Sequence, residues 1–358
     1  MRKNLTFLGI ETSCDETAAA IIRENDNGTA DILSNIVSSQ IDKHKEFGGV
    51  VPEIAARAHL ENIEYIIKTA IEKSKISLEK IDGVAATAGP GLIVCLTVGL
   101  NIGKSIAAFS KKPFIGVNHL EGHALSPTLE TKINFPYLLL LISGGHTQFL
   151  IVKDVNQYEQ LGTTIDDALG EAFDKTAKML NLGYPGGPNV EKFSKLGDKN
   201  FFKLPEPIIN KAGCNLSFAG LKTAVLRVSK KIKKNEKLRF NLAASFQNTI
   251  NKILYKKTKV AIKMFNEKIK NEEVKLIVAG GVAANKSIRE NLLRLSNEMN
   301  FKIFYPDLKF CGDNAAMIAW AGIKRFKKKM IDNFNISAKS RWPLDNEAPY
   351  MKGPGLKL

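Results

Sequence analysis

Two histidines four residues apart are the first candidates for chemistry in this chain of 358 residues. His119 and His123 lie in the segment NHLEGH (118–123), which is predicted to begin a helix. At this spacing two imidazoles share one helix face and can bind one metal ion. Two polar surface or capping residues would show the same spacing. A buried strand at 135–142, followed by the turn SGGHT (143–147), favours a site.

A metal ion held by two histidines needs a third ligand, which is normally a carboxylate. Asp313 is the candidate, because Gly312 leaves room beside it and the helix that starts there would face a cleft. The alternative is that Asp313 is only the N-cap of that helix, which is the commonest role of such a residue.

Two glycine turns follow buried strands and predict a nucleotide site. They are SGGHT and AGGVAAN (279–285). A backbone without Cβ atoms lets N–H groups face a phosphate. In the second turn, Gly280 and Gly281 permit close approach, while Asn285 can cap a helix and also contact a ribose or base. Each turn alone is equally typical of an ordinary hairpin or strand–turn–helix, but two in corresponding positions favour ligand binding.

Hydrophobic patterns predict two halves with the same plan. Residues 8–22 and 140–152 each predict a strand, a polar turn and a strand, followed by alternating strands and helices. The fold class is therefore α/β with a duplicated core, in two lobes with a central cleft. We expect an N-terminal lobe over 1–118 completed by a C-terminal helix at 313–330, a C-terminal lobe over 119–312 with a basic helical insertion at 217–270, and a loose tail at 345–358.

Two long helices are predicted in the N-terminal half. The pattern over 48–75 predicts a helix with Pro52 in its first turn, and 92–109 predicts a helix that is apolar nearly all round. Such a helix is buried or packs on a partner. The apolar stripe of the first helix is predicted to contain Ala56, Leu60, Ile63, Ile67 and Ala70.

The formal net charge of +16 indicates an anionic partner, with nucleic acid the best candidate. Residues 222–275 contain sixteen Lys or Arg and four Glu, and a second basic cluster, KRFKKK, occupies 324–329. A lysine-rich proteome would raise the total charge as well, but it would not concentrate the charge in one segment.

The cysteines and the hydropathy exclude several classes of protein. No two of the four cysteines have CxxC spacing, so a disulfide scaffold and a zinc ribbon are not expected. No apolar run approaches the roughly 20 residues of a membrane span. The N-terminus lacks the pattern of a secretory signal. We therefore expect a cytoplasmic protein with no membrane partner.

Eight motifs together resemble the bacterial TsaD proteins, formerly called YgjD or Gcp, over roughly residues 5–345. They are LGIETSCDET, GGVVPEIAARAH, NHLEGH, LLISGGHTQ, AFDKTAKML, YPGGP, AGGVAAN and FCGDNAAMIA. The resemblance implies an actin/Hsp70/sugar-kinase-like (ASKHA) fold. It also implies transfer of a threonylcarbamoyl group from threonylcarbamoyl-AMP to N6 of the adenosine next to the anticodon, at tRNA position 37, in tRNAs that read ANN codons.

The resemblance also implies site residues and partners. His119, His123 and Asp313 match the ligands of one divalent metal ion per subunit, with Fe²⁺ preferred and Zn²⁺ the alternative. Glu191 stands where many bacterial members have an Asp ligand for ribose, at a position that varies. The expected partners are a catalytically inactive paralogue and a small P-loop ATPase, and the helices at 52–75 and 92–109 are either that interface or internal core. The positions that match nucleotide-binding residues are Leu141, Ile142, Ser143, Gly144, Gly145, Asp174, Gly187 and Asn285.

Acyl transfer from an adenylate agrees with the residues themselves. The acyl group is already activated, so the protein must position it and stabilise charge rather than supply a covalent nucleophile. We therefore assign no serine or cysteine nucleophile, and Cys14 is expected to be a packing residue.

Three alternatives are weighed against this function. A metalloprotease would need HExxH, but Glu121 stands two residues after His119 and off its helix face. A small-molecule kinase of the same superfamily would share the glycine turns. However, Glu11, Asp15 and Glu16 would repel a triphosphate without Mg²⁺, and the histidine pair would have no role. A non-catalytic paralogue would be expected to lack some of the three metal ligands.

Overall fold

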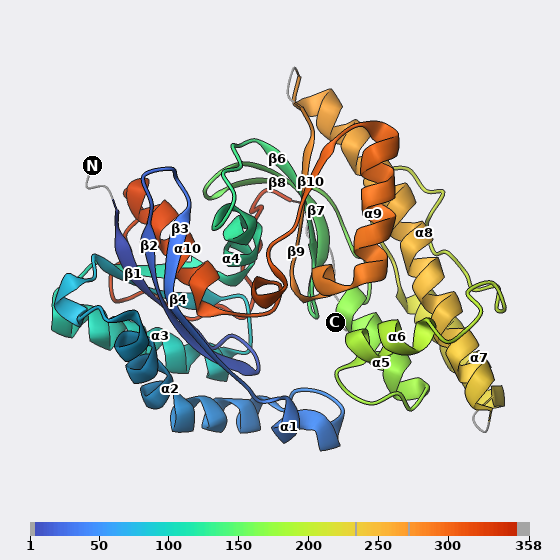
Figure 1. The fold of residues 1–358 in the computed structure, drawn as a ribbon, viewed down its shortest axis with the longest axis horizontal. Coiled ribbons are helices and arrows are strands. Elements are labelled where there is room, and N and C mark those ends of the chain that lie inside the picture. The colour runs from blue at the N-terminus through green and yellow to red at the C-terminus, as the bar shows by residue number, and fades with distance from the viewer. Residues whose placement is uncertain (1–3, 233–234, 271–272, 349–358) are drawn as a thin grey trace. The chain divides into compact units, whose positions relative to one another are not determined.

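The computed structural model of the chain describes residues 4–232, 235–270 and 273–348, and within them it is α/β, as predicted (Figure 1). The strands are β1 (Thr6–Glu11), β2 (Glu16–Glu24), β3 (Ala30–Ser39), β4 (Gly83–Gly89), β5 (Phe114–Asn118), β6 (Tyr137–Ile142), β7 (Thr147–Asp154), β8 (Gln157–Thr163), β9 (Lys275–Ala279) and β10 (Lys302–Phe304). The α-helices are α1 (Ile41–His44), α2 (Pro52–Ser74), α3 (Ile93–Ser110), α4 (His119–Leu125), α5 (Leu169–Met179), α6 (Gly186–Ser194), α7 (Ala219–Ile232), α8 (Glu236–Lys268), α9 (Lys286–Met299) and α10 (Ala315–Lys327).

The two sheets share one topology. Their strand orders are β3-β2-β1-β4-β5 and β10-β9-β6-β7-β8. In each sheet the first strand, β1 or β6, is antiparallel to the strand that follows it and parallel to β4 or β9. The last strand, β5 or β10, continues the parallel part. The predicted duplication of the core is therefore confirmed.

Contacts divide the described chain into two compact units. Unit 1 contains residues up to 134, 154–157 and 306–346, and the rest belong to unit 2. The boundaries expected from the sequence at 118 and 312 differ from this division, because α4 and the loop before α10 pack within unit 1. Of the predicted tail, residues 345–348 contain no helix or strand, and the remainder lies outside the described residues.

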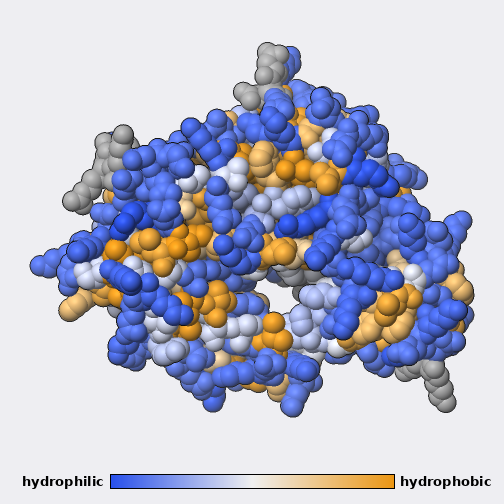
Figure 2. Space-filling view, viewed as in Figure 1, coloured by the Kyte–Doolittle hydropathy of each residue, from blue (hydrophilic) through white to orange (hydrophobic). Residues whose placement is uncertain are grey.

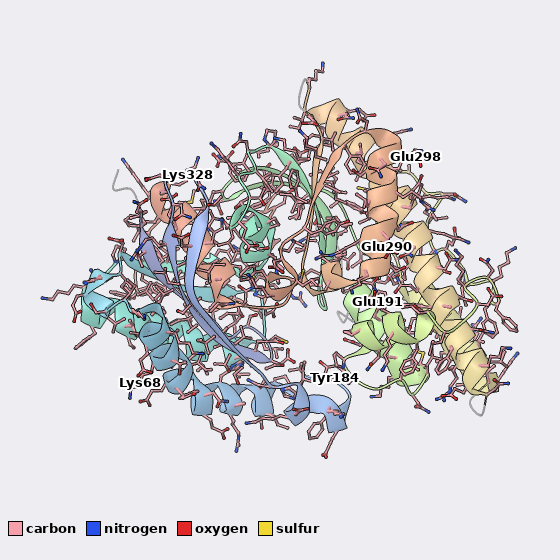
Figure 3. All side chains as sticks on the ribbon, viewed as in Figure 1. Lys68, Tyr184, Glu191, Glu290, Glu298 and Lys328 are labelled. Atoms are coloured by element: carbon pink, nitrogen blue, oxygen red, sulfur yellow. The ribbon has the colours of Figure 1, made fainter. Side chains whose placement is uncertain are left out.

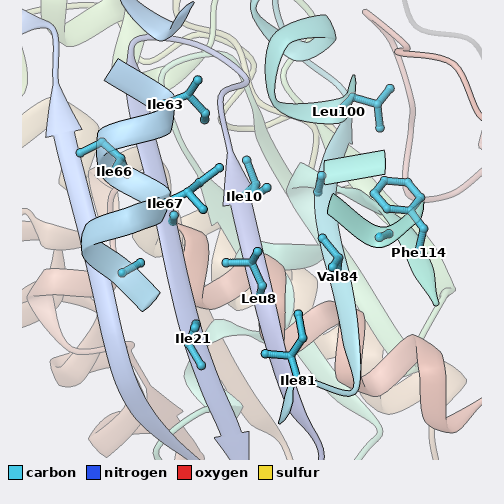
Figure 4. Close-up of a cluster of buried hydrophobic side chains, with 14 of the residues drawn as sticks. Leu8, Ile10, Ile21, Ile63, Ile66, Ile67, Ile81, Val84, Leu100 and Phe114 are labelled. Carbon is cyan, nitrogen blue, oxygen red and sulfur yellow. The ribbon is translucent and has the colours of Figure 1, made fainter. Parts of the chain in front are cut away.

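The strand β1 sends alternate residues to the two faces of the unit 1 sheet. Leu8 and Ile10 belong to a hydrophobic cluster with Ile63 of α2 and Leu100 of α3 (Figure 4). Gly9 faces α10 on the opposite side. The sheet therefore lies between α2 and α3 on one face and α10 on the other.

The helices α2 and α3 depart from expectation in two respects. Ile63, Ile67 and Ala70 are buried as predicted, but Leu60 is 63% exposed, so its place in the apolar stripe was wrong. In these first turns the buried side chains are Ala55 and His59, one position before the predicted Ala56 and Leu60, so the buried stripe runs one position earlier there. By length and composition alone, α3 could cross a membrane, as could many core helices of soluble proteins. In this structure Gly99 and Gly103 of α3 pack against the sheet of unit 1.

Unit 2 contains the predicted basic helical segment. The range 217–270 contains α7 and the 33-residue helix α8. The long helix packs against α6, α7 and α9. Because α9 also starts directly after the second glycine turn, this helical layer reaches the carboxyl end of β9.

The close approach of α10 to β1 gives a prediction about stability. A Cβ atom on Gly9 would lie 2.3 Å from the carbonyl oxygen of Ala315 and 2.7 Å from the backbone nitrogen of Ala319. Gly9→Ala should therefore lower the free energy of unfolding by about 1–3 kcal/mol or more. Gly49→Ala is the control, because no atom lies within 4 Å of its added methyl group. Urea unfolding would contradict this packing if the two variants were equally stable.

Candidate functional site

Three parallel strands of unit 1 end at the edge where the candidate metal ligands gather. Glu11 ends β1, Thr87 lies near the end of β4, and His119 directly follows β5. Neighbouring parallel strands place their carboxyl ends at the same sheet edge. The helix predicted for the histidine pair is confirmed: α4 begins at His119 and is capped by Asn118, whose side chain accepts the Leu120 N–H at 2.9 Å.

The structure brings His119, His123 and Asp313 together. Asp313 Oδ1 lies 3.1 Å from Nε2 of His123 and 3.4 Å from Nε2 of His119. The imidazole rings are nearly perpendicular, with centroids 4.8 Å apart. One candidate ligand atom from each of the three residues lies within 4.8 Å of the others. The spacing of four therefore delivers both rings to one carboxylate.

Asp313 is not the N-cap of α10, so that alternative was wrong. Asn314 caps the helix by accepting the Met317 N–H at 3.0 Å, and its amide donates to the Gly312 carbonyl at 2.9 Å. The cap lies one residue later than expected, because Asn suits this position as well as Asp does. The carboxylate of Asp313 can therefore face the histidines.

Glu11 is a site residue to which the sequence analysis gave no such role. Its buried carboxylate accepts the Ser13 N–H and the Thr87 hydroxyl, each at 2.5 Å, and Oε2 lies 3.0 Å from Nδ1 of His119. A carboxylate on one imidazole nitrogen fixes the ring so that the other nitrogen faces a metal. The available signal was an acid at the carboxyl end of a buried strand.

The charges around His119 favour a cation. Burial alone would lower its pKa, but the carboxylates of Asp313 and Glu11 raise the pKa of His119 well above its usual value. Burial would raise the pKa of Asp313, but His119 and His123 lower that pKa. An imidazole between two carboxylates, with nitrogens of both histidines facing Asp313, offers the ligand types that a divalent metal ion takes in proteins.

Nearby acids strengthen this preference. Burial and the negative charges of Asp313 and Asp15 raise the pKa of Glu16 well above its usual value. Burial and Asp15 likewise raise the pKa of the Cys14 thiol. A thiol with a raised pKa is a poor nucleophile, which agrees with the expectation that Cys14 is a packing residue.

The predicted nucleotide residues lie in unit 2, where two glycine turns meet at one sheet edge. Leu141 and Ile142 end β6, which is parallel to β9, and the turn at 143–146 follows. Gly280 begins the second turn with φ +93°, and a Cβ there would lie 2.5 Å from the carbonyl oxygen of Ile142. The second turn therefore packs against the first, and only glycine suits Gly280.

Packing does not explain four other glycines of this region. Gly144, Gly145, Gly187 and Gly281 have no atom within 4 Å of an added Cβ, and none has a positive φ. Their backbone faces open space. Such a backbone can present N–H groups to a phosphate or ribose without steric hindrance.

Two of the remaining predicted residues connect helices, Asp174 joining α5 to α6 and Glu191 joining α6 to α9. Asp174 Oδ1 accepts the Gly186 N–H at 2.8 Å, and Glu191 Oε1 accepts the Lys286 N–H at 3.0 Å. Asn285 caps α9, as predicted, by accepting the Ile288 N–H at 2.9 Å. The amide of Asn285 donates to Gln247 Oε1 at 2.9 Å, a partner that the sequence analysis did not identify.

Comparisons with solved structures identify the fold. A HypF from T. kodakarensis superposes with a TM-score of 0.60 at 14% identity, covering 92% of this chain and 49% of that protein. A full-length HypF in its phosphate- and nucleotide-bound form gives a TM-score of 0.55 at 13% identity, with 92% and 47% coverage. At these identities the likeness concerns the fold alone, and it confirms the predicted ASKHA class.

Comparisons of sequence identify the family. The profile described as TsaD, tRNA N6-adenosine threonylcarbamoyltransferase, matches residues 31–320. A protein of that name from Pelagibacter ubique is 59% identical over 358 residues, with 100% of both chains covered. Another from Sinorhizobium medicae is 49% identical over 354 residues, or 98% of each chain. These relatives favour neither the kinase nor the protease, and the chain belongs to the tRNA N6-adenosine threonylcarbamoyltransferase family.

Proposed function

We propose that the protein transfers the threonylcarbamoyl group of threonylcarbamoyl-AMP to N6 of adenosine 37 in tRNAs that read ANN codons. The N6 nitrogen bonds to the carbamoyl carbon, the bond from that carbon to the phosphate oxygen breaks, N6 loses a proton and AMP leaves. The observation that carries the proposal is the cluster of His119, His123 and Asp313 in a chain of this family.

The proposed cofactor is one divalent metal ion, Fe²⁺ in preference to Zn²⁺, held by His119, His123 and Asp313. When bound, it would act as a Lewis acid and orient the threonyl carboxylate or the phosphate. Glu11 and Ser13 contact Nδ1 of His119 and would hold that ring in the binding orientation.

The adenylate is proposed to bind at the glycine turns of unit 2. The open backbone of Gly144, Gly145 and Gly281 supports phosphate or ribose binding. The other proposed adenylate residues are Leu141, Ile142, Ser143, Asp174, Gly187, Asn285 and, at the variable ribose position, Glu191. No covalent nucleophile is needed, because the leaving AMP already activates the carbonyl.

The proposed partners are a catalytically inactive paralogue and a small P-loop ATPase, with the cytoplasm as the proposed compartment. Exposed apolar side chains of α2 and α3 support a protein partner on unit 1. They include Leu60, Tyr65, Ile93, Val94 and Phe109, of which Phe109 is 87% exposed.

Transferase assays on ligand variants test the function and its metal together. His119→Ala or His123→Ala should remove bound metal and abolish formation of threonylcarbamoyl-adenosine, because each loses one of three ligands. The product is measured by nucleoside mass spectrometry after incubation with threonylcarbamoyl-AMP and tRNA, together with any required partners. The control is Asp307→Asn, an exposed carboxylate that pairs with Lys309. A wild-type protein that forms no product would contradict the function. A histidine variant with full metal and activity would contradict the metal site.

A second test concerns the glycine turns. Gly145→Val or Gly281→Val places a branched side chain where N–H groups are proposed to meet the ligand. The loss of one or two hydrogen bonds to a charged group should weaken AMP binding about tenfold or more. Thermal stability should change little, because both sites are open, and Gly49→Val is the control. Calorimetric titrations in which both turn variants bind AMP normally would leave the turns with a structural role only.

A further inference from the structure

The basic cluster at 324–329 is engaged within unit 1. Burial lowers the pKa of Lys324 to about 8, and its ammonium lies 3.9 Å from the ring centroid of Trp320. The cluster's ion pairs are Arg325–Glu121 at 2.7 Å, Lys327–Glu24 at 2.6 Å, and Lys328–Asp154 (Lys328 is labelled in Figure 3). Because these cations are paired with carboxylates, their positive potential at the surface is largely cancelled and attracts a polyanion only weakly.

The basic segment at 222–275 is also engaged in part. Lys257 is buried and donates to the carbonyls of Lys211 and Gly213, each at 3.0 Å. Lys233 and Lys234 lie outside the described residues. The segment's ion pairs include Lys222–Asp167, Lys259–Glu298 at 3.0 Å and Lys268–Glu159 at 2.6 Å. The sequence count therefore overstates the free charge.

Free positive charge instead gathers along a groove between α8 and α9 in unit 2. This α8–α9 groove has a volume of about 740 Å³, and Glu290 is the one carboxylate among its lining residues (Figure 3). Figure 2 shows mainly hydrophilic residues over the visible face of α9. The cations that line the groove are Lys195, Lys199, Lys252, Lys256, Lys286 and Arg294.

Most of these cations lack a close counter-ion. Among the described residues, Lys199, Lys256 and Lys286 form no ion pair within 4.0 Å. Lys195 lies 3.9 Å from Glu191, and Lys252 lies 3.7 Å from Glu206, so both pairs are long. A surplus of cations along a groove suits a chain of phosphates.

The floor of the groove is ordered by side-chain amides. Gln247, which receives the amide of Asn285, donates to Asn251 at 3.1 Å, and Asn251 donates to Ser287 at 2.8 Å. These bonds connect the nucleotide turn to the groove and leave further polar groups along α8 and α9. They favour a ligand with repeated polar units.

The outer part of the groove also contains a cation–π pair, Arg294 and Tyr255. The guanidinium of Arg294 lies 5.3 Å from the ring centroid of Tyr255, and it donates to Asn291 at 3.1 Å. The Tyr255 hydroxyl donates to Glu298. An aromatic ring fixed beside cations is typical of surfaces that follow a nucleic-acid strand.

We propose that the outer part of the α8–α9 groove, formed by Lys252, Tyr255, Lys256 and Arg294, binds the sugar–phosphate backbone of the tRNA substrate. This inference rests on the proposed function, which supplies the RNA. The inner end, which borders Asn285, is not part of the proposal. Each phosphate contact releases condensed counter-ions, so binding through this surface must weaken with salt.

The test uses a triple variant, Lys252→Gln, Lys256→Gln and Arg294→Gln. All three residues are exposed, so the fold should persist. The matched control removes the same charge from Lys230, Lys231 and Lys237, which are exposed on α7 and at the start of α8. Binding of an unmodified tRNA transcript is measured by fluorescence anisotropy over a range of KCl concentrations, together with AMP binding and transferase kinetics.

The groove variant should bind tRNA more weakly, and its log–log salt slope should fall by about 2–3 for three lost contacts. AMP binding should not change, and the transferase should show a raised KM for tRNA with kcat retained. The α7 control should keep the wild-type slope. A groove variant with wild-type affinity and slope would overturn the inference. Failure of the proposed function would appear separately, as absence of product from the wild-type protein.

Discussion

The His119 imidazole, held between the carboxylates of Glu11 and Asp313, is the arrangement on which the candidate metal site depends. Glu11 and Asp313 lie on opposite nitrogens of the His119 imidazole, and together they raise its pKa well above the usual value. Breaking such a buried arrangement by removing one partner is costly, because the remaining charge has no compensation. The fold of unit 1 positions these residues. The strands β1, β4 and β5 end at one edge of the sheet, and the packing of α10 on Gly9 brings Asp313 to that edge.

The duplicated core provides two edges with different chemistry. In unit 1 the residues at the ends of β1 and β5 are an acid and an imidazole. In unit 2 the turns after β6 and β9 contain four glycines. Packing does not explain Gly144, Gly145 or Gly281, whereas backbone geometry requires Gly280. One topology therefore places the candidate metal ligands in one unit and an open glycine backbone in the other.

Sequence patterns correctly predicted the features of the fold that depend on local periodicity. The two hairpins, the start of α4 at His119 and the cap at Asn285 follow from strand alternation, helical spacing and capping preference. The Asp313 cap was wrong by one residue, because Asn314 has an equal capping preference and only packing decides between them. The contact of Glu11 with His119 joins residues 108 positions apart, so no local pattern could show it. The groove cations likewise come from α8, α9 and the segment that follows α6, and their pairing depends on the fold.

Metal affinity of a Glu11→Gln variant tests the central claim most directly. The amide preserves the shape of the side chain but removes the charge that orients His119 and favours a cation. Competition titration with a chromophoric chelator, with Zn²⁺ as the probe metal, should show affinity reduced about 10–100-fold while the circular dichroism spectrum is unchanged. An unchanged Zn²⁺ affinity in a folded variant would contradict the account, because the buried carboxylate would then have no influence on the metal site.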